Sequence, residues 1–180
     1  MKLDRYSRDR DLWRDWAAIN YRAAKVLFQT GDPFLWFPAA TLGHHALEMY
    51  LKSALIANGL TVFNPNELKR LDAGVKLTAA ECAWGHELIE LGQKLADIRA
   101  TFDLSKEIDF GGSLVLKAPM TLREGLNIFD PFFSELRYPR AMEKVEGLGE
   151  EHGRLLDSLV TELRHARFQW NRDAGTAASA

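Results

Sequence analysis

The chain of 180 residues has a single cysteine, Cys82, and no apolar run near its start. One cysteine excludes an intramolecular disulfide and a cysteine-rich metal site. The opening residues, MKLDRYSRDRDLWRDW, carry charges throughout. We therefore expect neither a signal peptide nor a membrane span, and we expect a cytoplasmic protein.

Basic residues are not in excess either, since 23 Lys and Arg stand against 25 Asp and Glu, for a net charge of −2. This balance removes any global electrostatic attraction to nucleic acid. Arginines do gather near both ends of the chain, interleaved with acidic residues: Arg5, Arg8, Arg10, Arg14, Arg154, Arg164, Arg167 and Arg172. The interleaving favours solvated helix faces, and a phosphate-binding surface is the alternative.

The common catalytic signatures are missing as well. Gly111-Gly112 lacks the strand–loop–helix setting and the following Lys of a phosphate-binding loop. Ser53 and Ser134 have no triad context, and Cys82 is close to His86 only along the sequence. The sequence therefore indicates no catalytic residue and no cofactor.

Amphipathic segments are what the chain has in place of these signatures. Apolar residues recur at spacings of three and four over about 9–29, 38–58, 86–102, 121–136 and 150–170. We expect a short aromatic hinge at 34–38 and a break near Phe129-Asp130, because Pro131 removes a backbone donor. Residues 103–118 allow either an ordered loop or a brief β-ladder, and the structure of 60–84 stays open.

This pattern predicts the fold class. With 47% hydrophobic and 27% charged residues, the chain has the balance of a soluble globular protein that can bury a core. We expect one all-α domain over residues 1–172, an antiparallel bundle of about five main helices. The tail at 173–180 has nothing to bury and should be disordered.

The most informative stretch is TLGHHALEMYLKSALIANG at 41–59, where His44, Glu48 and Lys52 follow one another at steps of four. Residues four apart lie one above the other on a helix, so the three side chains form a polar ridge. The flanking positions are almost all apolar, which predicts that part of this ridge is buried. A buried charge needs a partner, and His86, Arg137 and Tyr138 are candidates from later segments.

Three ordered strings resemble the HEPN family of helical proteins: ALEMYLK at 46–52, HELIEL at 86–91 and LRYP at 136–139. The resemblance covers roughly residues 10–140. It implies a helical bundle that often forms a homodimer, and a ligand such as a nucleotide or RNA. It also implies partner proteins such as a nucleotidyltransferase or an antitoxin, in a bacterial stress or defence context.

Ribonuclease members of that family carry an Arg, then four to six residues, then a His. None of the five histidines in this chain has an Arg at those offsets. The sequence therefore departs from the nuclease pattern, which argues against that activity and leaves nucleotide or partner binding open.

The polar residues allow three interpretations. In the first, His44, Glu48, Lys52, His86 and Arg137 form a satisfied structural network that sets helix register. In the second they form a nucleotide pocket, where Lys52 and Arg137 take phosphate and Tyr138 stacks on a base. In the third a metal binds, but His44–Glu48 and the single Glu-x-x-His at 162–165 fall short of a di-metal motif, so no metal site is expected.

The sequence thus predicts a HEPN-like binding or interaction module that is not an enzyme. The alternative is an atypical metal-independent endoribonuclease, toxin-like, whose site draws on His86, His44 and Arg137.

Overall fold

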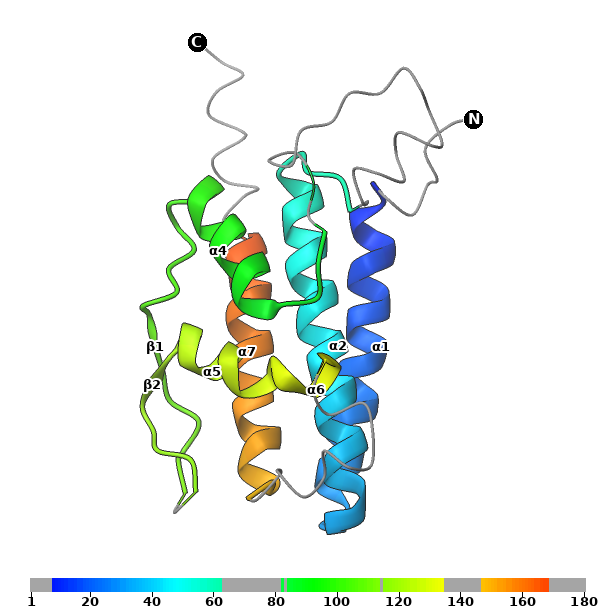
Figure 1. Cartoon of the computed structure of the whole chain (residues 1–180), viewed down its shortest axis with the longest axis vertical. Coiled ribbons are helices and arrows are strands. Elements are labelled where there is room, and N and C mark those ends of the chain that lie inside the picture. The colour runs from blue at the N-terminus through cyan, green and yellow to red at the C-terminus, as the bar shows by residue number, and fades with distance from the viewer. Residues whose placement is uncertain (1–7, 63–81, 83, 114, 135–146, 169–180) are drawn as a thin grey trace.

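The computed structural model describes residues 8–62, 82, 84–113, 115–134 and 147–168 (Figure 1). Within these residues the chain is mostly helical, which confirms the all-α prediction. The elements are α1 (Arg10–Gln29), α2 (Pro33–Ala57), α4 (Leu88–Ile98), β1 (Glu107–Ile108), β2 (Met120–Thr121), α5 (Leu122–Phe129), α6 (Pro131–Ser134) and α7 (Glu150–Phe168). The expected disordered tail at 173–180 lies outside the described residues.

Helices α1 and α2 form an antiparallel pair joined by a short turn (Figure 1). The carboxylate of Asp9 caps α1 by accepting from the backbone N–H of Leu12. Asp32 caps α2 in the same way at Phe34, and Pro33 occupies the first turn, where its missing N–H costs nothing.

The expected hinge at 34–38 is wrong, because this segment is already part of α2. The start signal at Asp32-Pro33 precedes it, and Pro38 stands inside the helix. Pro38 removes one backbone hydrogen bond, but Ala39 and Ala40 directly after it are fully buried. Tertiary packing therefore holds the helix through the proline.

The third predicted helix is shorter than expected. Helix α4 covers only Leu88–Ile98, although Phe102 is still buried beyond its end. The open question at 103–118 is resolved as a brief antiparallel ladder, with Glu107 opposite Thr121 and Ile108 opposite Met120. The predicted break at 129–130 is confirmed, since α5 ends at Phe129 and α6 begins at Pro131.

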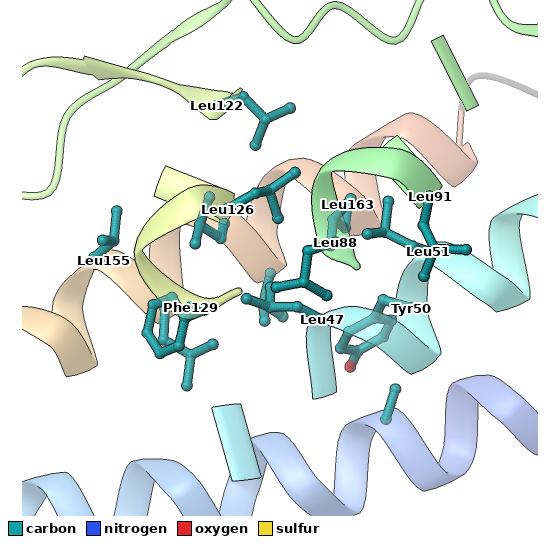
Figure 2. Packing of buried hydrophobic residues seen from close by; sticks show 14 of the residues in the cluster. Leu47, Tyr50, Leu51, Leu88, Leu91, Leu122, Leu126, Phe129, Leu155 and Leu163 are labelled. Atoms are coloured by element: carbon teal, nitrogen blue, oxygen red, sulfur yellow. The ribbon is translucent and has the colours of Figure 1, made fainter. Parts of the chain in front are cut away.

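Helix α2 is the centre of the molecule and packs against α1, α4, α5, α6 and α7. Side chains from α4, α5 and α7 pack around those of α2 (Figure 2). The fully buried members include Leu47, Leu51, Leu88, Leu91, Leu126, Phe129 and Leu155. Burying each such side chain contributes about 1.5–3 kcal/mol.

A glycine sets how closely α5 approaches α2. A Cβ at Gly43 would lie 2.9 Å from a ring carbon of Phe129 and 3.2 Å from Leu156. Only a residue without a side chain leaves room for that ring, so Gly43 seats the end of α5 on α2. No helix in the described part of the chain combines the length and apolar character needed to cross a bilayer.

Candidate functional site

The polar ridge of α2 lies inside the protein. His44, Glu48 and Lys52 are only 0%, 4% and 3% exposed. An isolated charge in such a place would lose several kcal/mol of hydration, so each group must find a partner within the fold.

Glu48 and Lys52 supply each other with that partner. The Lys52 Nζ atom lies 2.6 Å from Oε1 of Glu48, one helical turn away. The same ammonium lies 5.4 Å from the ring centre of Trp13 on α1, in cation–π range. Lys52 therefore links α1 to α2 and has no exposed surface to offer a ligand.

His86 joins the carboxylate from another part of the chain. Its Nδ1 atom lies 3.0 Å from Oε1 of Glu48, so Nδ1 carries the proton and donates it. His86 stands just before α4, and this contact therefore fixes the start of α4 against α2. The His86 side chain is 41% exposed, and its other ring nitrogen has no hydrogen-bond partner among the described residues.

His44 approaches Glu48 from the preceding turn of α2. Its Nδ1 atom donates to the backbone carbonyl of Phe129 over 3.0 Å, which leaves Nε2 facing Oε2 of Glu48 at 3.7 Å. The Nδ1 atom of the neighbouring His45 lies at the same distance from Oε2. His44 thus satisfies a carbonyl at the end of α5 that has no partner inside its own helix.

The pKa of Glu48 follows from two opposing effects. Burial raises the pKa of the carboxyl, but polar interactions with His44, His45 and Lys52 outweigh it. The pKa is held far below its ordinary value, so Glu48 stays ionised across the physiological range.

The break between α5 and α6 supplies the other side of the site. Asp130 accepts from the backbone N–H of Leu88 over 2.6 Å, so it caps the first turn of α4 from outside that helix. Burial raises the pKa of Asp130, while the Leu88 N–H and the nearby His44 lower it. The break before Pro131 therefore places the Asp130 carboxylate at the start of α4, where it acts as a cap.

The ring of Phe133 on α6 lies among the three imidazoles. It stacks on His86 with ring centres 4.0 Å apart and planes inclined by 22°. It stacks on His44 at 5.5 Å, and meets His45 edge-on at 5.7 Å. The ring of Trp84 meets that of His86 edge-on, with ring centres 6.3 Å apart. An aromatic wall therefore orients the histidines around Glu48.

Four of the residues singled out from sequence thus come together: His44, Glu48, Lys52 and His86. The other two, Arg137 and Tyr138, lie outside the described residues. Sequence reasoning missed His45, Asp130 and Phe133 as members of the cluster. His45 stands three residues before Glu48 on the helix and could have been found by that spacing, whereas no local signal marks the other two.

The arrangement permits limited chemistry. The Glu48 carboxylate is surrounded by cationic and imidazole groups, so it has little capacity left for a ligand. No three His, Cys, Asp or Glu side chains gather as metal ligands in the described part of the chain. The most exposed imidazole of the cluster is that of His86, which Glu48 holds by Nδ1 as a carboxylate holds the imidazole of an acid–base pair.

Comparison with known proteins assigns no family to the chain. No protein-family model, curated protein or solved structure matches the chain. The function must therefore be argued from the residues themselves and from the HEPN resemblance.

Proposed function

We propose that the chain is a HEPN-like helical binding module, without catalytic activity of its own, whose ligand is a nucleotide or RNA. The observation that carries this proposal is the pairing of the buried Glu48 carboxylate within the fold: Oε1 accepts from Lys52 and His86, and Oε2 lies 3.7 Å from His44 and from His45. A ridge whose charges are already paired inside the fold stabilises the bundle and performs no reaction.

In the same proposal the molecule acts as a homodimer in a bacterial stress or defence context, beside a nucleotidyltransferase or antitoxin partner. The HEPN resemblance supports this part. An exposed aromatic residue on α1, Trp16, supports a protein contact, because 53% of its surface is open.

The experiment is a melting-temperature screen of the purified protein against nucleotides and short RNAs, together with an RNA-cleavage assay. A ligand at about 100 times its Kd should raise Tm by about 5–10 °C at this chain length. Intact RNA after incubation with concentrated protein is the expected result of the cleavage assay. Cleavage that His86→Ala abolishes would overturn the proposal.

A second function, metal-independent RNA cleavage, has one specific observation in its favour. Glu48 orients His86 at 3.0 Å, and the His86 side chain is 41% exposed with no described hydrogen-bond partner at its other ring nitrogen, which suits a general base. The His86→Ala comparison decides between the two, because a binding module keeps RNA intact with either protein.

A further inference from the structure

A pocket of about 350 Å³ opens on the side of α2 that faces away from the Glu48 network. Tyr50 and Ala57 belong to its wall, and both lie about half a turn around the helix from Glu48. The start of α1 and the ends of α2, α4 and α7 meet at this end of the bundle (Figure 1). The pocket is thus separate from the site described above.

Four arginines from three helices converge on this pocket: Arg10, Arg14, Arg99 and Arg164. They are far apart in the sequence, on α1, at the end of α4 and on α7. None of the described residues that line the pocket is acidic. Arg14 is paired with Asp11 and Asp15 on its own helix, each at 2.8 Å, so part of the positive charge is compensated.

Two of the arginines have donors left for a ligand. The guanidinium of Arg99 has no hydrogen-bond or ion-pair partner in the described part of the chain. Arg164 donates from Nε and Nη2 to the hydroxyl oxygen of Tyr50, at 3.1 and 2.7 Å, and keeps its Nη1 group. Since the Tyr50 oxygen already accepts twice, its own O–H is left to donate.

Small side chains create the hollow. Ala18 on α1 and Ala54 and Ala57 on α2 line it, together with Leu163 on α7. This apolar wall beside the guanidinium groups suits a ligand with a flat apolar part and an anionic part. At about 350 Å³ the pocket is near the lower end of the size range of ligand sites, which fits a molecule of mononucleotide size.

We propose that this pocket binds a phosphate monoester of mononucleotide size, with Arg99, Arg164 and the Tyr50 hydroxyl on the phosphate and the alanine wall against the base. Guanidinium groups match phosphate oxygens with paired, charge-assisted hydrogen bonds. The inference rests on the proposed binding function and gives it a location.

The test measures Kd by calorimetry for AMP and for inorganic phosphate, with the full chain and three variants. Arg99→Gln removes a phosphate donor, and Ala54→Leu fills the hollow without changing charge. Each should weaken AMP binding about tenfold or more. Arg123→Gln, an exposed arginine on α5 outside the pocket, is the matched control and should leave Kd unchanged within about twofold.

The possible results distinguish failure of the pocket assignment from failure of the proposed binding function. AMP binding that Arg99→Gln and Ala54→Leu leave intact would overturn the pocket while the binding function stands. No AMP binding by the wild-type chain would overturn both the pocket and the nucleotide part of the function. Inorganic phosphate that binds as tightly as AMP would overturn the assignment of a nucleotide, because the alanine wall would then contribute nothing. Far-ultraviolet circular dichroism and Tm of each unliganded variant establish that it folds.

Discussion

Two groups of cationic side chains lie on opposite sides of α2, and they differ in where the balancing charge comes from. Around Glu48, one buried carboxylate balances Lys52 and draws in His86. Around the pocket, none of the described lining residues is acidic; Asp11 and Asp15 outside it pair with Arg14, and Arg99 has no described partner. A cation inside a protein must take its counter-ion from the fold, whereas a cation at an open hollow can take it from a ligand. This contrast separates the buried Glu48 network from the pocket that we propose as a binding site.

The largest effect should come from removing the buried counter-ion. Glu48→Ala leaves Lys52 charged at 3% exposure, which should lower the free energy of unfolding by about 3–5 kcal/mol. Urea unfolding measures it. The matched control is Glu162→Ala, which breaks the half-exposed pair with Lys106 and should cost at most about 1 kcal/mol.

A Glu48→Ala protein with nearly wild-type stability would contradict the contrast between the two regions, because the buried network would then contribute no more than a surface ion pair. A more stringent test of the buried ion pair is the double variant Glu48→Ala with Lys52→Met. Removing both charges should recover much of the loss, since an apolar pair leaves no buried charge without a partner.

A smaller loss should follow when packing, and not charge, is disturbed on the network side. Gly43→Ala puts a Cβ 2.9 Å from the Phe129 ring, and should lower the free energy of unfolding by about 1–3 kcal/mol. It should also displace the Phe129 carbonyl from His44. Gly59→Ala is unsuitable as a control because the φ of Gly59 is +90°. Ala18→Gly lies away from this contact, in the pocket wall on α1, and its lower helix propensity should cost about 1 kcal/mol. A Gly43→Ala protein as stable as wild type would contradict the close approach of α5.

Acid should affect the network and leave the arginines unchanged, because arginine does not titrate in this range. The pKa of Glu48 in the folded protein lies below its ordinary value of 4.5, so the unfolded chain binds more protons as the pH falls. The stability that Glu48 contributes is therefore present above about pH 4.5 and is lost below it. The stability difference between wild type and Glu48→Gln should shrink as the pH is lowered through this window, in urea titrations at each pH. A constant difference would contradict the lowered pKa.

His152 on α7 should make the stability depend on pH in a second range. Burial lowers its pKa below the ordinary 6.5, against the opposing influence of Glu151 and the Gly149 N–H. The unfolded state again binds more protons, so stability should begin to fall below about pH 6.5. In His152→Gln this part of the pH dependence should vanish, and the same slope in both proteins would argue against a buried neutral imidazole.

The smallest effect on stability should be at the pocket. Arg99→Gln removes a guanidinium that has no described partner, so the free energy of unfolding should change by less than about 0.5 kcal/mol. Urea unfolding without ligand measures it. A loss comparable to that of Glu48→Ala would mean that Arg99 belongs to a structural network, and the contrast between the two regions would fail.

Sequence alone predicted part of this picture, for reasons that lie in helix periodicity. The step of four between Glu48 and Lys52 places them on one ridge, and the apolar flanks predict its burial. The break at 129–130 follows from Pro131. These features depend on neighbours along the chain.

The features that sequence did not reveal depend on distant contacts. Nothing local to Phe133 or Asp130 shows that they will meet His86 and α4. From the sequence, Arg164 is interpreted as part of a solvated helix face, with a phosphate-binding surface as the alternative, and Arg99 is not singled out. A pocket shared by separate helix ends exists only after the bundle is assembled. The tight fit at Gly43 cannot be predicted from the sequence either, because the Phe129 ring approaches Gly43 only in the folded protein.

The most direct test of the contrast is a nuclear magnetic resonance titration of the ¹⁵N-labelled chain with AMP. The account predicts saturable shifts of backbone and side-chain signals at Tyr50, Arg99 and Arg164, with the signals of Glu48 and His86 unmoved. Shifts centred on Glu48 and His86, with the arginines silent, would contradict it and make the buried network the binding site.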